Sequence, residues 1–186
     1  MDKNSISEKQ EWEESEYAQD SFELFLLHKK IDKLFEDFCN EDYDDWEVYA
    51  QVYQAKDLSE LDRQVKNRLH YEVKKFHCSL TQDPHFVASM IDRIQVVPLS
   101  GNFESIGGAA RFYLGSDYFK PGVAGRVQTF ENAFAHLVGP YSVTRLQKHF
   151  DDLKVDFPFD DLYILDDLFV VFAGDKAILI GWGSNE

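Results

Sequence analysis

The feature of this sequence that most constrains its fold is a pair of apolar runs near the C-terminus. Residues 168–173 read LFVVFA, residues 177–180 read AILI, and Gly174-Asp175 lies between them. β-Branched and aromatic runs joined by a short turn that begins with Gly predict a β-hairpin. Because neither run alternates with polar residues, both faces of the hairpin need to be covered. The sequence therefore predicts a sheet packed between other elements.

The chain before this hairpin shows helical periodicity. Apolar residues recur every three or four positions over 22–38, and Ser21 is placed to cap that helix. Asp57 opens a second helix with an Asp-type capping box, and Asp83, followed by proline, opens a third. Other patterns predict helices at 46–53 and 142–150, strands at 94–97 and 111–114, and loops at 100–110 and 115–125. A further helix is predicted at 130–138, capped by Thr129 and ended by Gly139-Pro140.

These patterns together predict an α+β fold, in which a helical N-terminal half packs on a small, mostly antiparallel C-terminal sheet. The length of 186 residues suits one domain. Residues 1–18 are polar and lack a sustained period, so we expect a loose acidic N-terminal arm, in which Trp12 and Tyr17 are the residues suited to dock back. Residues 19–186 are expected to form a single α+β domain.

The charge balance restricts the class of partner. The chain has 34 Asp and Glu residues against 19 Lys and Arg residues, a net charge of −15. Such a charge repels nucleic acid and anionic membranes and attracts a basic protein. The sequence has no apolar run long enough to span a membrane, no secretory signal, and only two isolated cysteines, Cys39 and Cys78. We therefore expect a cytoplasmic protein whose direct partner is neither nucleic acid nor membrane.

Patterns for catalysis or metal binding fit poorly. Residues 40–51 resemble a calcium-binding loop, but Asp45 replaces the required glycine and Gln51 replaces the bidentate glutamate. The histidines lack metal-ligand spacing, and His77 and Cys78 are helix neighbours that do not face each other. The sequence therefore predicts no catalytic residue, no metal and no cofactor.

The Gly-rich segment 99–128 keeps an enzymatic alternative open. It reads as a long connection, and long loops in compact domains are often functional. Its basic residues are Arg111, Lys120 and Arg126, but the glycines lack phosphate-binding spacing. If the protein has a small-molecule pocket, we expect it in this segment.

Two segments combine acidic and aromatic side chains, the combination with which a binding surface anchors a basic partner. One segment covers residues 42–53 and the other covers residues 157–167. We predict that partner binding involves Asp42, Asp44, Asp45, Trp46, Glu47, Asp160, Asp161, Tyr163, Asp166 and Asp167.

The C-terminal stretch DDLYILDDLFVVFAGDKAILIGWGSNE, residues 160–186, resembles the closing hairpin of small bacterial immunity proteins of polymorphic and contact-dependent toxin systems. The resemblance covers 27 of the 186 residues. It implies an inhibitor that neutralises a toxin inside the cell. The acidity of this chain, not the resemblance, predicts that the toxin domain is basic, as a domain that cleaves nucleic acid would be. The alternatives are an acidic DNA mimic or adaptor, and an enzyme with a site near 99–128.

Overall fold

The computed structural model describes residues 3–39, 46–76, 83–101, 103–114, 123–147 and 167–184. In chain order, the elements are α1 (Lys3–Glu14), the 3₁₀ turn η1 (Glu16–Gln19), α2 (Phe22–Cys39), β1 (Trp46–Tyr53), α3 (Leu58–Phe76), α4 (Pro84–Arg93), β2 (Val97–Pro98), α5 (Ile106–Leu114), α6 (Val123–Val138), β3 (Ser142–Gln147), β4 (Asp167–Ala173) and β5 (Lys176–Ser184). None of the described helices has both the length and the apolar character needed to cross a membrane.

The described strands form one sheet in the order β1-β5-β4-β3-β2, and every neighbouring pair is antiparallel. The predicted hairpin is confirmed: Ala173 pairs with Lys176, so Gly174 and Asp175 alone make the turn. Gly174 has a φ of +62°, and no described non-glycine residue has a positive φ. A positive φ at only the first turn residue is the pattern of a type II′ turn, which favours glycine there.

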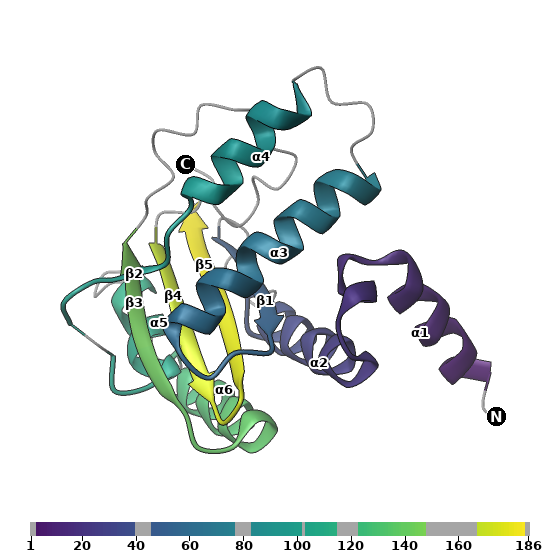
Figure 1. The fold of residues 1–186 in the computed structure, drawn as a ribbon. Helices are drawn as coiled ribbons and strands as arrows, with labels where there is room; N and C mark the ends of the chain where they lie inside the picture. Colours follow the sequence, from purple (N-terminus) through teal and green to yellow (C-terminus); the bar gives the residue numbers. More distant parts are fainter. Residues whose placement is uncertain are drawn as a thin grey trace.

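Helices cover both faces of the sheet, as Figure 1 shows. One face carries Phe169 and Val171, which pack in a core with α2, α5 and α6. The other face carries Leu168 and Val170, which pack in a second core with α3 and α4. Successive residues of β4 thus enter opposite cores, as strand geometry requires. The α+β class is confirmed, and the continuous apolar runs are explained by burial on both sides.

The three helix starts that the sequence predicted are present. The Ser21 side chain accepts a hydrogen bond from the Leu24 N–H at 3.2 Å at the start of α2. Asp57 accepts one from Glu60 N–H at 2.9 Å before α3. The Asp83 carboxylate accepts one from the backbone N–H two residues later, at 3.0 Å, before α4. Each side chain satisfies a backbone donor that the first turn of a helix leaves unpaired.

The predicted helix at 46–53 is wrong, because this segment is strand β1. Its apolar and aromatic residues fit both a helical and an alternating spacing. In the strand, Ala50 and Val52 enter the core shared with α2, while Tyr49 and Tyr53 pack in the core shared with α3. Pairing with β5 along eight residues decides between the two periods.

The predicted loop at 100–110 is wrong from Ile106 onward and the predicted strand at 111–114 is wrong, because residues 106–114 form α5. The Ser105 hydroxyl caps this helix by accepting a hydrogen bond from Gly108 N–H at 3.1 Å. A Cβ on Gly107 would lie 3.3 Å from Val127 Cγ1 and 2.3 Å from a Glu131 carboxylate oxygen. Glycine therefore lets α5 approach α6, and it does not mark a loop here.

Helix α6 begins at Val123, six residues before the predicted cap at Thr129. The Thr129 hydroxyl donates to the Gly125 carbonyl at 2.9 Å, a bond that a threonine makes inside a helix. The helix ends before Gly139, whose φ is +81°, as the sequence predicted. Residues 142–147 form strand β3 where a helix was expected, and the expected strand at 94–97 is reduced to β2.

The N-terminal segment, expected to be a loose arm, has regular structure over α1 and η1. Tyr17 is fully buried, and Trp12 packs edge-on against Phe22 with ring centroids 5.7 Å apart. The Trp12 ring N–H donates to the Tyr17 carbonyl at 2.7 Å. These are the two residues that the sequence marked as able to dock, and they attach the segment to the body of the protein.

Candidate functional site

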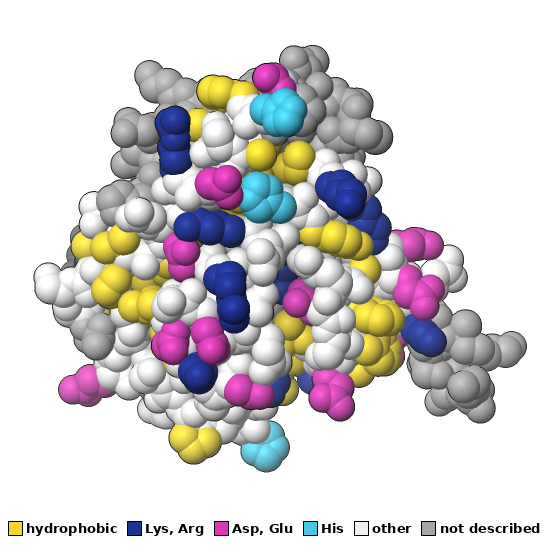
Figure 2. Space-filling view, viewed as in Figure 1, with side chains coloured by type: hydrophobic (Ala, Val, Ile, Leu, Met, Phe, Trp, Pro, Cys, Tyr) yellow, Lys and Arg dark blue, Asp and Glu magenta, His cyan; other side chains and the backbone are white. Residues whose placement is uncertain are grey.

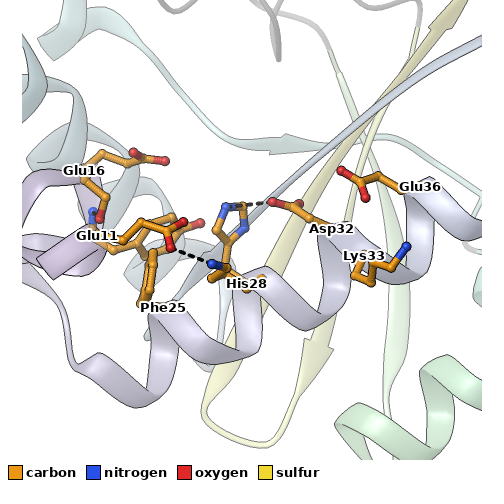
Figure 3. A pocket seen from close by; sticks show the side chains of 10 residues that line it. Glu11, Glu16, Phe25, His28, Asp32, Lys33 and Glu36 are labelled. Carbon is orange, nitrogen blue, oxygen red and sulfur yellow. Dashed lines mark hydrogen bonds and ion pairs between the residues drawn. The ribbon is translucent and has the colours of Figure 1, made fainter. Parts of the chain in front are cut away.

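A groove of about 370 Å³ lies where α1 and η1 meet α2. Figure 3 shows His28, Asp32 and Glu36 projecting from one side of α2, at a spacing of four residues, with Glu11 and Glu16 nearby from the N-terminal segment. The complete lining is Glu11, Ser15, Glu16, Tyr17, Phe25, His28, Lys29, Asp32, Lys33 and Glu36. We call this feature the acidic groove.

The acidic groove has more negative than positive groups. Four carboxylates and two ammonium groups line it, which gives a net charge of −2 with His28 neutral. Lys29 binds Glu11 at 2.6 Å, and Lys33 pairs with Asp37, which lies outside the lining. Within the described part of the chain, no cation forms an ion pair with Glu16 or Glu36. The groove therefore has spare capacity for a positive charge.

In the acidic groove, His28 lies between Glu11 and Glu16 of the N-terminal segment and the carboxylates further along α2 (Figure 3). Its ring stacks on Tyr17 with centroids 4.5 Å apart and an interplanar angle of 24°. Its Nε2 lies 2.9 Å from a carboxylate oxygen of Asp32. Its Nδ1 is buried and has no hydrogen-bond partner among the described residues. The Asp32 contact and the stack hold the imidazole in place.

The η1 wall of the groove is attached to the sheet through Tyr17. Its hydroxyl oxygen accepts the N–H of Val52 in β1 at 3.0 Å. The Ser15 hydroxyl caps the turn by accepting from Tyr17 N–H at 3.1 Å, and it donates to the Trp12 carbonyl at 2.9 Å. Because both hydrogen-bonding roles of this hydroxyl are used, Ser15 is structural in this arrangement.

Beneath η1, a buried arginine joins the N-terminal segment to α3. Arg68 is 2 % exposed, and its guanidinium lies between the rings of Tyr17 and Tyr53, 4.2 and 4.0 Å from their centroids. Its Nη2 donates to Asp20 at 2.7 Å and to the Val52 carbonyl at 2.7 Å. No described residue accepts a hydrogen bond from Nε or Nη1. Contact with two rings compensates in part for this loss, since desolvated cation–π contacts are strong.

One turn further along α3, Glu72 is a buried carboxyl group with 5 % exposure. Desolvation by burial, reinforced by the charge of Glu16, raises the pKa of Glu72 to about 7, although Arg68 acts in the opposite direction. Burial also raises the pKa of the Tyr17 and Tyr53 phenols, so both rings stay neutral. Arg68 and Glu72 thus form a charged cluster, the Arg68 cluster, directly behind the groove wall.

The chemistry available to these residues is the binding of cations. Within the described ranges, no three His, Cys, Asp or Glu side chains are placed to share a metal ion. The acidic groove offers the carboxylate acceptors of Glu11, Glu16, Asp32 and Glu36, which suit a lysine or arginine side chain. The site is therefore suited to a basic side chain of a partner.

The partner-binding residues predicted from the sequence lie mostly outside the described residues. Asp42, Asp44, Asp45, Asp160, Asp161, Tyr163 and Asp166 all fall there. Of the other three, only the backbone is described: Trp46 and Glu47 begin β1, and Asp167 begins β4. Their role in binding stays a prediction.

The sheet nevertheless brings Trp46 and Asp167, which belong to the two predicted segments, to the same end of strand β5. Trp46 pairs with Ser184 at the end of β5, and Asp167 pairs with Trp182 on the other side of that strand. Asp45 immediately precedes Trp46 in the chain, and Asp166 immediately precedes Asp167. The two acidic segments therefore enter the sheet at one end, on either side of β5.

The acidic groove and the Arg68 cluster were not predicted from the sequence. A signal for the cluster exists: Arg68 and Glu72 fall on the same helical stripe as the buried Leu61 and Val65. Charged residues within an apolar stripe indicate a buried polar network. The groove has no such signal, because α1 shows no periodicity that would have placed it beside α2.

Two of the three basic residues of the segment 99–128 lie on helices. Arg111 is in the last turn of α5 and Arg126 is in α6, while Lys120 lies outside the described residues. The described part of the segment expected to be a long loop is therefore helical over 106–114 and 123–128. On the face drawn in Figure 2, which carries α3 and α4, Lys and Arg side chains are interspersed with Asp and Glu.

Comparisons with known protein families, with curated proteins and with solved structures gave no match for this chain. The resemblance of residues 160–186 to bacterial immunity proteins is neither supported nor refuted by them. Function is therefore inferred from the charge and geometry of the site.

Proposed function

We propose that this protein is an acidic protein-binding module, and that it acts as an immunity protein that inhibits a basic toxin domain inside the cell. The observation that carries the proposal is the acidic groove, where Glu16 and Glu36 have no cationic partner among the described residues. A concave surface with spare negative charge favours a partner whose surface is positive.

The lining of the groove supports recognition of a single basic side chain. Asp32 and Glu36 occupy consecutive turns of α2, and Glu11 and Glu16 lie across the groove from them (Figure 3). A lysine or arginine side chain that enters the groove can place its charge between these carboxylates. Interfaces gain most of their binding energy from anchors of this kind.

The inhibitor function fits the partner that such a surface selects. A toxin that cleaves nucleic acid needs a positive active-site surface to bind phosphates. An acidic inhibitor meets that surface quickly, because opposite charges steer the encounter. The net charge of −15 supports this mode.

The test uses the protein encoded next to this chain's gene, because an immunity gene is expected directly after its toxin gene. We expect the purified toxin domain to bind the full chain, with an association rate that falls steeply as salt rises. The double variant Asp32→Asn/Glu36→Gln should slow association at least several-fold at low salt, because it removes two groove charges.

The matched control is the double variant Glu23→Gln/Glu104→Gln, which also removes two exposed carboxylates but leaves the groove intact. It should associate at nearly the rate of the unmodified protein. Equal slowing by both double variants would show that net charge matters and the groove does not. A neighbouring gene product that fails to bind, or a gene that stands among metabolic genes, would contradict the inhibitor function.

A further inference from the structure

Glu16 lines the acidic groove and also acts electrostatically on Glu72 of the Arg68 cluster. It lines the groove as part of the η1 wall. Its negative charge also acts on Glu72, which lies behind that wall on α3. The protonation state of a buried group is thus connected to the wall of the groove.

The η1 wall is attached to α3 by cations. Arg68 binds Asp20 at 2.7 Å directly after η1. Lys75 donates to the backbone carbonyls of Glu13 and Ser15, at 2.9 and 3.2 Å, at the end of α1. These contacts hold a segment whose helix α1 is otherwise mostly exposed. A short polar helix of this kind depends on its tertiary contacts for stability.

Ionised Glu72 is the group that destabilises the contact between η1 and α3. The charged and titratable groups that act on it are Arg68 on α3, Glu16 from η1 and Tyr53 from β1. Burial and Glu16 raise the pKa of Glu72 to about 7, so the attached state favours the protonated, neutral carboxyl. When η1 moves away, Glu72 meets water and its pKa falls toward the ordinary value of 4.5.

We propose that ionisation of Glu72 loosens η1 from α3, so that the Arg68 cluster acts as a pH-sensitive latch for one wall of the acidic groove. Ionised Glu72 repels Glu16 and attracts Arg68, whose Nε and Nη1 have no described acceptor. Arg68 is then shared between Glu72 and Asp20, and the Asp20 anchor weakens. The effect of the latch on partner binding rests on the proposed function, whereas the seating of η1 does not.

The direction of the pH dependence follows from proton linkage. The attached state binds a proton on Glu72 more tightly than the detached state does. Detachment is therefore favoured as pH rises from about 4.5 to about 7, and its equilibrium constant levels off above that range. Over this window the detachment constant should increase by at least about tenfold.

The test is hydrogen–deuterium exchange on the full chain at pH 5.0 and pH 7.5, corrected for the intrinsic pH dependence of exchange. We expect the opening constant of peptides that cover residues 12–20 to rise at least about tenfold, more than that of peptides from β4 and β5. Glu72→Gln should remove this extra rise, and Glu23→Gln should keep it. Glu16→Gln should reduce it, because Glu72 then titrates at lower pH in the attached state.

A flat profile for residues 12–20, or the same rise in Glu72→Gln, would overturn the proposal. If Glu72→Gln fails to fold, the Glu16→Gln variant decides. A rise of the opening constant for residues 12–20 in Glu16→Gln that equals the rise in the unmodified protein also overturns the proposal. The exchange experiment needs no partner, so its outcome is separate from that of the toxin-binding test. Binding without a pH-dependent latch would leave the proposed function standing and reject only this inference.

Discussion

The Tyr17 hydroxyl oxygen accepts the backbone N–H of Val52 at 3.0 Å, and this bond ties the N-terminal segment to the edge of the sheet. The Val52 carbonyl accepts from Arg68 Nη2 at 2.7 Å. In an antiparallel strand, the N–H and C=O of one residue point the same way, so both groups of Val52 point away from β5. Because β1 is an edge strand, Tyr17 and Arg68 occupy the position where another strand would pair.

Tyr17→Phe should lower the free energy of unfolding by about 1–2 kcal/mol, because the buried N–H of Val52 loses its acceptor. Urea unfolding followed by tryptophan fluorescence measures the change. Tyr141→Phe is the matched control, since the Tyr141 hydroxyl accepts the Ile106 N–H at a longer 3.3 Å and is only partly buried. A loss in Tyr141→Phe as large as that in Tyr17→Phe would contradict this ranking.

Arg68→Met should cost about 3–5 kcal/mol, the range found when one partner of a buried ion pair is removed. The substitution leaves the Asp20 carboxylate and the Val52 carbonyl without their donor. Arg68→Lys keeps a charge but cannot stack between two rings, so it should fall between Arg68→Met and the unmodified protein. Urea unfolding of both variants, of Asp20→Asn alone and of each combination with Asp20→Asn gives the coupling energy. A coupling near zero would show that the Asp20 contact contributes nothing.

The sequence predicts those elements whose local signals agree with their tertiary surroundings. Helices α2, α3 and α4 each have a capping side chain and an apolar stripe, and both signals point to the same helix. The hairpin β4–β5 has a Gly-first turn between two apolar runs. In these elements the cap or turn residue predicted from the sequence is the one that caps the helix or forms the turn in the structure.

Elements that depend on distant partners are predicted poorly. Strand β1 exists because β5 pairs with it along its whole length, and nothing in residues 46–53 reports that pairing. Gly107 reads as a loop residue, but it lies in α5, where an added Cβ would be 3.3 Å from Val127 Cγ1 of α6. Each of these errors comes from a contact between residues far apart in the chain.

The candidate site shows the same limit. The sequence identifies acidic segments by composition, and the register of β5 with β1 and β4 then brings their ends together. The acidic groove instead depends on how α1 and η1 lie against α2, which rests on single contacts such as Trp12 with Phe22. Such contacts are set by the folded core, since α1 has no apolar stripe that would predict them.

Two glycines should respond in opposite ways to alanine. Gly174 has a φ of +62°, which an L-residue adopts only with strain, so Gly174→Ala should destabilise the protein by about 1 kcal/mol. Gly125 lies in helix α6 with an ordinary φ and open space around an added Cβ, so Gly125→Ala should stabilise it by about 0.5–1 kcal/mol. Thermal unfolding of both variants measures the signs. The same sign in both would contradict this assignment of backbone strain.

Cys39 should react slowly with thiol reagents in the folded protein. Desolvation by burial raises the pKa of its thiol to about 11, so only about one molecule in a thousand carries the thiolate at pH 8. In a Cys78→Ser variant, alkylation by iodoacetamide followed by mass spectrometry isolates this residue. The rate should increase sharply in urea, where the thiol meets water. Folded-state labelling as fast as that of a small free thiol would contradict burial of Cys39.

Glu72 should make the folded protein less stable as pH rises through the slightly acidic range. The pKa of Glu72 is raised to about 7 in the fold from 4.5 without it, so the folded state binds the proton more tightly. The stabilisation is fully present below about pH 4.5, declines between pH 4.5 and 7, and is lost above pH 7. The Glu72→Gln variant lacks this loss, so its advantage in unfolding free energy over the unmodified protein should grow with pH to at most about 3 kcal/mol.

Urea unfolding at pH 5, 6, 7 and 8 measures the difference, with Glu23→Gln as the control that should show no such growth. A difference that stays constant over this range would mean that Glu72 is already ionised in the fold at pH 5, and that the charge of Arg68 outweighs both burial and Glu16.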